Sequence, residues 1–189
     1  MPVQTSYASE HPAAFEGQRA NLNLASISSK VAENSAIPFG RAVVQGTGDD
    51  QCKLPTAAGQ RFLGISEMTT AWSKDENDLH QYDEYREVNY MDFGEIWVYT
   101  EQDVVPGDSA FFRHTAGTAP NNILGRFRKD SDSGKADEVV GAAFDSTASA
   151  GELAKVKLFV PGVGVKVVVD SSDVLDAAGA VSLETATTY

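Results

Sequence analysis

Apolar residues cluster in short runs along the chain, and Gly, Pro, Asn and Asp separate these runs. Residues 88–100 form the longest run, in which alternate apolar positions indicate a strand with one buried face. No stretch has the apolar spacing of a long amphipathic helix. Further strand-length runs lie at 42–44, 52–55, 62–66, 104–113, 124–128, 138–144 and 154–160. The pattern predicts an all-β fold, a single small β-barrel or jelly-roll-like domain.

Turn residues refine this prediction at four places. Residues 46–50 have the composition of a tight turn, and Pro106-Gly107 favours a type II turn before the strand that ends at Arg113. Residues 92–95 predict a turn or bulge within the longest run. Gly64 lies inside an apolar strand, which predicts a bulge or a close approach of another backbone.

The two ends of the chain differ from this body. Residues 1–24 contain small or scattered apolar residues and two prolines, which predicts an extended N-terminal arm; a frayed terminus is the alternative. Residues 22–27 alternate apolar and polar positions and predict a short strand leading into the body, which spans 25–160. Residues 161–189 form a C-terminal extension, whose β-prone part at 165–170 needs a partner strand, from the main sheet or from an adjacent subunit.

A polar, acidic segment at 69–85 is predicted to form an exposed loop. It contains three aromatic residues, which a purely solvating loop does not need and which often mark protein contacts. The alternative is that these rings fold back onto the core of the domain. The candidate contact residues from the arm, this loop and the C-terminal strand are Tyr7, Phe15, Trp72, Tyr82, Tyr85, Val167 and Val169.

Charge and composition restrict the partners. Asp and Glu outnumber Lys and Arg by 27 to 15, and the net charge of −12 disfavours binding to nucleic acid. No apolar run approaches the roughly 18 residues of a membrane span, and the first residues do not resemble a secretory signal. We therefore expect a protein that binds no membrane and stays in the cytoplasm where it is made, or in an assembly formed there.

A search for catalytic and metal-binding patterns predicts no catalytic site, metal or cofactor. Cys52 has no second cysteine to pair with and is expected to be a small buried residue. The three histidines lack metal-ligand spacing, and no phosphate-binding loop is present. Residues 130–134 resemble part of a calcium loop, but Gly141 stands where the ligating Glu should be. Acidic residues that could line a glycosidase-like groove are explained by chance in so acidic a chain; they are Glu84, Glu87, Asp92 and Glu95.

An ordered series of motifs resembles the capsid cement, or decoration, proteins of tailed phages. The series runs through Pro38-Phe-Gly-Arg-Ala-Val, Lys53-Leu-Pro, Phe62-Leu-Gly-Ile, the Trp97-Val strand, Val104-Val-Pro-Gly-Asp, Leu124-Gly-Arg-Phe-Arg and Ala154-Lys-Val-Lys-Leu. Each motif alone is weak, and the specificity lies in their order over about residues 36–160.

This resemblance implies a non-enzymatic structural protein of the virion. It implies binding to the major capsid protein on the outer surface of the shell, and self-association as a homodimer or homotrimer at a symmetry position. A rival prediction from another class is a carbohydrate-binding β module of a phage tail or surface protein, in which Trp72, Trp97 and tyrosines would stack on sugars.

Overall fold

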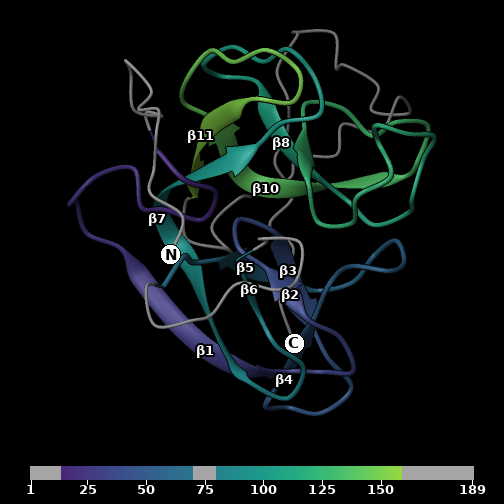
Figure 1. Ribbon diagram of the computed structural model, residues 1–189. Coiled ribbons are helices and arrows are strands. Elements are labelled where there is room, and N and C mark those ends of the chain that lie inside the picture. The colour runs from purple at the N-terminus through teal and green to yellow at the C-terminus, as the bar shows by residue number, and fades with distance from the viewer. Residues whose placement is uncertain (1–13, 70–79, 159–189) are drawn as a thin grey trace, which may run out of the picture.

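The computed structural model describes residues 14–69 and 80–158, which contain eleven strands and no helix (Figure 1). The predicted all-β fold is confirmed. None of the described segments forms a helix that could cross a membrane. The strands are β1 Ser26–Ala32, β2 Ile37–Pro38, β3 Ala42–Gln45, β4 Gln51–Lys53, β5 Phe62–Ser66, β6 Gln81–Tyr82, β7 Glu87–Tyr99, β8 Ser109–Arg113, β9 Phe127–Arg128, β10 Ala136–Phe144 and β11 Leu153–Leu158.

Five strands close into a small barrel, which confirms the barrel form of the prediction. The order around the ring is β1-β4-β3-β5-β7, and β7 pairs back to β1. All neighbours are antiparallel except β1 and β4, which are parallel at Val31 and Ala32 only. A closed ring leaves fewer unpaired edges than an open sheet of the same size.

The strand β7 is long enough to serve two groups of strands. Its first half pairs with β1 and β5, and its second half pairs with β11, which continues the sheet through β10, β8 and β9. Figure 1 shows β7 bending between these halves. The bend coincides with a register shift opposite Ser26 and with Gly94 at φ 133°, so the irregularity predicted at residues 92–95 is confirmed as a bulge.

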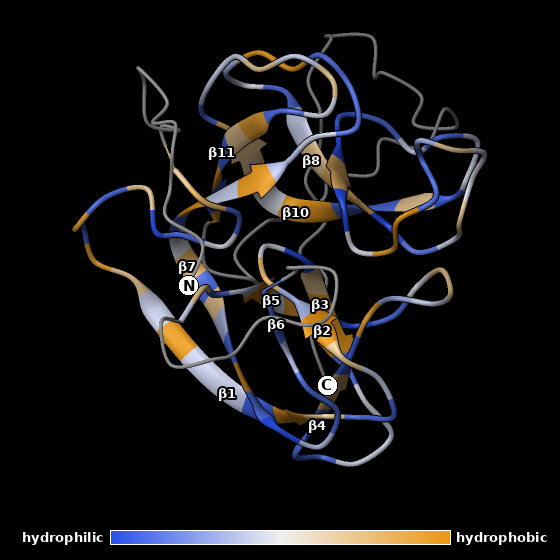
Figure 2. Cartoon of the chain, viewed as in Figure 1, coloured by the Kyte–Doolittle hydropathy of each residue, from blue (hydrophilic) through white to orange (hydrophobic). Residues whose placement is uncertain are grey.

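Two clusters of buried residues hold these groups together. Figure 2 shows hydrophobic residues along the strands and mostly hydrophilic residues in the loops between them. The smaller cluster includes Val43, Leu63, Val88 and Tyr90 of the barrel strands. The larger cluster joins the opposite faces of β3, β5 and β7 to the apolar side chains of β8 to β11; its members include Val44, Ile65, Met91, Phe112 and Phe144. Side chains that alternate along β3, β5 and β7 thus pack into the two clusters on opposite faces of these strands.

Three sequence expectations need correction. Residues 22–25 are not a strand, and the first strand is instead β1, which reaches Ala32. Only Phe127 and Arg128 of the expected strand at 124–128 form a regular strand, although Gly125 and Arg126 also bond to the backbone of Arg113. The expected loop at 69–85 contains β6, whose pairing with β2 carries Tyr82 into the core.

The predicted turns are confirmed. The N–H of Asp108 donates to the carbonyl of Val105 over 3.1 Å, and Gly107 adopts φ 95°, as position three of a type II turn requires. Residues 46–51 are closed by a bond from the N–H of Gly46 to the carbonyl of Gln51.

Gly64 confirms the expected close backbone approach and supports a first prediction. A Cβ at this position would lie 2.3 Å from the carbonyl oxygen of Met91 on the neighbouring strand. Gly64→Ala should therefore lower the free energy of unfolding by about 1–3 kcal/mol, since the backbone of β5 or β7 must shift. Urea unfolding measures the effect. Gly48→Ala is the control, because its Cβ would meet only the flexible Gln51 side chain at 3.1 Å; equal midpoints for the two variants would contradict the prediction.

Candidate functional site

The last residues of the predicted arm lie against the body as an added strand-like segment. Gly17 donates to the carbonyl of Trp97 over 2.8 Å, Trp97 donates to the carbonyl of Gln18 over 2.9 Å, and Ala20 donates to the carbonyl of Glu95 over 2.8 Å. Residues 17–20 therefore pair with the second half of β7 and lie beside it. This pairing fixes the point from which the following residues project.

Contacts with the barrel anchor the same segment from its other side. The carbonyl of Gly17 accepts from the N–H of Met68 over 2.7 Å. Gly17 has φ 79°, and a Cβ there would lie 2.8 Å from the backbone nitrogen of Gly40, so only glycine fits. Next to it, the carboxylate of Glu16 lies 3.1 Å from the buried guanidinium of Arg41. Burial raises the pKa of Glu16, although the charges of Arg41 and Arg126 act in the opposite direction.

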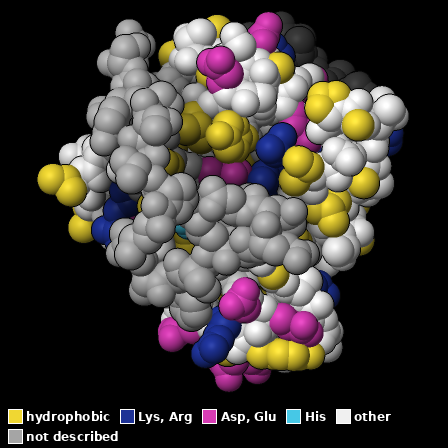
Figure 3. All heavy atoms as spheres, in the orientation of Figure 1, with side chains coloured by type: hydrophobic (Ala, Val, Ile, Leu, Met, Phe, Trp, Pro, Cys, Tyr) yellow, Lys and Arg dark blue, Asp and Glu magenta, His cyan; other side chains and the backbone are white. Residues whose placement is uncertain are grey.

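Residues 21–25 connect this anchored segment to β1, and we call them the leucine loop. Its exposed residues 22–24 project from the body, whereas Ala25 packs against the larger core cluster. Leu22 is 103% exposed and Leu24 is 83% exposed, the highest values among the large apolar side chains in the described part of the chain. Figure 1 shows the loop leading into β1 at the left edge of the molecule, and Figure 3 shows hydrophobic atoms projecting at that edge. Leucines as exposed as these contribute little to the stability of the isolated chain.

Shallow hollows flank the leucine loop on both sides. One, of about 580 Å³, lies between Phe15, Leu22 and Met68. The other, of about 250 Å³, lies between Leu24, Phe93 and Leu158. Apolar side chains therefore continue from the loop onto the neighbouring surface, which is the shape a partner needs in order to bury the two leucines.

The charges beside the leucine loop are paired with one another. Arg19 forms an ion pair with Glu67, and Lys157 lies 3.6 Å from Glu95. Glu95 also accepts a hydrogen bond from the side chain of Asn21. Although the chain has a net charge of −12, the charged side chains beside the leucine loop therefore balance one another.

The structure separates the predicted contact residues. Phe15 is 55% exposed and shares a hollow with Leu22. Tyr85 is 64% exposed and donates from its hydroxyl to Asn34, at the end of β1 opposite to the leucine loop. Tyr82 takes the alternative role foreseen for these rings: it is fully buried, packs edge-on against Phe39 at 5.1 Å and donates to the carbonyl of Glu67. The remaining candidates lie outside the described residues; they are Tyr7, Trp72, Val167 and Val169.

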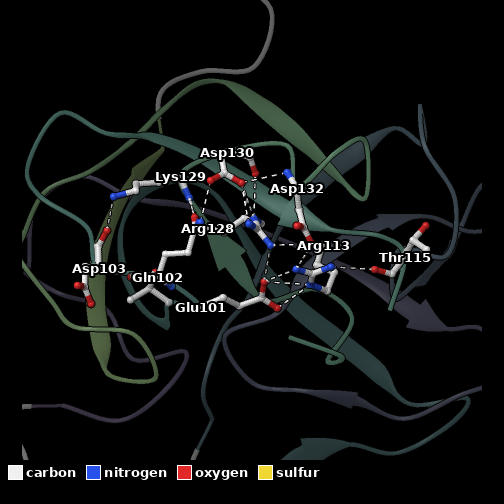
Figure 4. Close-up of polar contacts among 10 residues, drawn as sticks. Glu101, Gln102, Asp103, Arg113, Thr115, Arg128, Lys129, Asp130 and Asp132 are labelled. Carbon is white, nitrogen blue, oxygen red and sulfur yellow. Dashed lines mark hydrogen bonds and ion pairs between the residues drawn. The ribbon is translucent and has the colours of Figure 1, made fainter. Parts of the chain in front are cut away.

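A buried ionic cluster that the sequence did not reveal lies at the far end of β7 (Figure 4). Arg113, at the end of β8, is fully buried and binds Glu101 through two contacts of 2.7 Å, from Nε to Oε1 and from Nη2 to Oε2. Arg128 of β9 reaches the same carboxylate at 3.2 Å. Both guanidinium groups also contact Asp132, at 2.8 and 3.0 Å. The cluster ties three chain segments together.

The pKa shifts in this cluster follow from its hydrogen bonds. The bond with Glu101 raises the pKa of Arg113. The bond from Arg113 lowers the pKa of Asp132. Partial burial acts to raise the pKa of Asp130, but bonds from Gln102, Asp132 and Arg128 lower it. Asp130 and Asp132 are both held in their charged form by hydrogen-bond donors, so the cluster is suited to holding the loop at 129–135 in place rather than to exchanging protons.

The acidic residues that could line a glycosidase-like groove each contact a partner of their own. Asp92 accepts from Ser28 and Glu87 accepts from Ser29, while Glu95 contacts Asn21 and Lys157. No group of three or more potential metal ligands occurs within residues 14–69 and 80–158. Cys52 is buried as predicted, and burial raises the pKa of its thiol to about 11, which keeps it protonated at neutral pH.

Comparisons with known proteins point to phage structural components. Residues 3–159 match the phage family described as structural cement protein (E217 gp24/Pam3 gp6). A chain from the structure entitled "The capsid of Myoviridae Phage XM1" has the same fold with a TM-score of 0.67 and 14% identity, over 84% of this chain and 98% of that one. A chain from "The crystal structure of head fiber gp8.5 N base in bacteriophage phi29" matches with a TM-score of only 0.38 and 17% identity, over 72% of this chain and 95% of that one. No protein of curated function matches the sequence.

Proposed function

This chain belongs to the family of phage structural cement proteins, and from that premise we propose that it binds the outer surface of a capsid and joins neighbouring major capsid subunits. A protein that binds only the expanded shell stabilises that state by its binding free energy at every copy. Many copies of a modest contact then add up to a large resistance against rupture. Copies at a symmetry axis of the shell would meet as dimers or trimers.

The observation that carries this proposal is the leucine loop. Its two leucines are almost completely exposed, and burying each against a partner is worth about 1.5–3 kcal/mol. Residues 17–20 hold the base of the loop on β7 through backbone hydrogen bonds, so little ordering is needed on binding. A pre-positioned apolar projection next to paired charges suits an apolar depression between two shell subunits.

The net charge of the protein supports binding at the outer face of the shell rather than the inner face. Packaged DNA presents a dense array of phosphates at the inner face, which repels a chain of net charge −12. The outer face carries no such array. We infer that the protein is made in the host cytoplasm and joins the shell from outside.

Co-sedimentation with shells tests the proposed function. Purified full-length protein is mixed with expanded empty shells, and separately with unexpanded shells, of the phage that encodes it. We expect saturable binding to expanded shells, weaker binding to unexpanded shells, and a higher disruption temperature of the decorated shells in calorimetry. An unrelated acidic protein of similar size serves as the control for trapping in the pellet. Failure to bind expanded shells at saturating concentration would overturn the proposal.

A further inference from the structure

Within residues 14–69 and 80–158, one side of β1 has no strand paired with it over most of its length. The opposite side pairs with β7 from Ser26 to Val31, whereas β4 pairs with Val31 and Ala32 only. The N–H of Ala32 bonds to Arg86 on the β7 side, and the N–H of Val31 bonds to Asp50 on the β4 side. By the alternation of a ladder, the N–H and carbonyl groups of Ile27 and Ser29 point away from β7. Among the described residues, no backbone group bonds to them.

The first four residues of β1 lack two features that usually protect an edge strand. Residues 26–29 contain no proline and no charged side chain. Beside them the barrel opens into a hollow of about 380 Å³, between β1 on one side and β3, β5 and β7 on the other. Its walls include Ser28, Lys30, Gln45, Arg61, Leu63 and Asp92. Space and unpaired backbone groups thus occur together, as they do where a strand is added to a sheet.

Leu158, the last residue that the structure describes, lies close to Ser26, where β1 begins. Leu158, the last residue of β11, lies opposite Gly94 of β7, and Ser26 lies opposite Phe93, the adjacent residue. Leu158 and Leu24 line the same hollow. Both β11 and β1 run antiparallel to β7, so the chain leaves β11 in the direction in which β1 begins.

We propose that residues 165–170 add to the free edge of β1 as a parallel strand of the same chain. This segment reads Val-Lys-Val-Val-Val-Asp, a strongly β-prone sequence whose six residues are enough to cover the free positions 26–29. Residues 159–164 span up to about 20 Å, which exceeds the one strand spacing of about 4.8 Å that the chain must step across. Gly162 and Gly164 permit that step. The added strand does not depend on binding to a shell.

Amide hydrogen exchange on the full-length protein tests this strand addition residue by residue. We expect the amides of Ile27 and Ser29 to be protected in the full-length protein. The double substitution Val167→Pro and Val169→Pro removes two backbone donors from the added strand and should speed exchange at Ile27 and Ser29 by about tenfold or more. Ser28 and Lys30 bond to β7 and should keep their exchange rates, which also reports that the barrel stays folded.

A matched pair of substitutions and a dilution series complete the test. Ala177→Pro with Ala178→Pro places two prolines in the same extension outside the proposed strand and should leave all four amides unchanged. Unprotected Ile27 and Ser29 amides in the full-length protein would overturn the proposal, as would protection that both proline pairs leave intact. Protection that is lost when the protein is diluted to a monomer would also overturn it, because the strand would then come from a second copy.

Discussion

Replacing both Leu22 and Leu24 with aspartate should abolish the binding of the protein to expanded shells and leave its fold intact. The two side chains are 103% and 83% exposed, so they contribute little packing to the isolated chain. In a complex they would together contribute about 3–6 kcal/mol, so the double substitution should weaken affinity by about 10²- to 10⁴-fold. Burying two carboxylates in an apolar depression would add to that loss.

The measurement is a binding isotherm on purified shells, with urea unfolding of the free protein as the test of folding. The matched control is Val105→Asp with Val140→Asp, which adds the same two charges at side chains that are each 52% exposed and lie outside the leucine loop. The control should keep the affinity of the natural protein. Because the charges beside the loop are already paired, binding of the natural protein should also change little between 0.1 and about 0.5 M salt. If the variant with both leucines replaced binds expanded shells as tightly as the natural protein does, the leucine loop does not contact the shell.

The regular parts of the fold were predictable because their signals are local. An apolar run with turn residues on both sides predicts a strand wherever it packs, and the strands at 42–45, 62–66 and 87–99 follow this rule. The turn at Pro106-Gly107 follows from the fixed φ of proline and the freedom of glycine. Even the bulge in β7 had a local cause, a glycine within an otherwise regular strand.

Elements set by distant contacts were missed. β1 reads Ser-Ile-Ser-Ser-Lys-Val-Ala, which carries little apolar alternation, and it is a strand because β7 offers it a complete ladder. The residues before it alternate leucine with asparagine and therefore resemble a strand, but their backbone leaves β7 and forms the leucine loop. The predicted contact residues consequently did not include the two most exposed leucines. Two leucines set between asparagines, outside any longer apolar run, could have indicated an exposed apolar loop.

The aromatic loop and the ionic cluster show the same limit. Tyr82 and Tyr85 are three residues apart in one acidic segment, yet one is buried and the other is 64% exposed, because two residues of β6 pair with β2. Arg113 and Arg128 each end an apolar strand and resemble solvated terminal charges. Their burial depends on Glu101, which comes from a different part of the chain. Only the folded topology brings these three groups together.

The largest loss of stability should come from Arg113→Met. This change keeps the volume of the side chain close to that of arginine but leaves the fully buried carboxylate of Glu101 with Arg128 alone, at 3.2 Å. It also removes a donor from Asp132 and from the carbonyl of Thr115. Removing one partner of a buried pair typically costs about 3–5 kcal/mol, so the midpoint of urea unfolding at pH 7 should fall steeply.

Two further variants separate the buried pair from a general effect of lost charge. Lys155→Met removes the cation of an exposed pair, 3.7 Å from Asp145, and should cost no more than about 1 kcal/mol. Adding Glu101→Gln to Arg113→Met removes the uncompensated buried charge, so the double variant should lose less stability than the sum of the two single variants. If Arg113→Met unfolds within about 1 kcal/mol of the natural protein, water must reach Glu101 and solvate it in place of the guanidinium. The cluster would then fix the loop at 129–135 without stabilising the barrel, and its hydrogen bonds would be exchanged for water rather than lost.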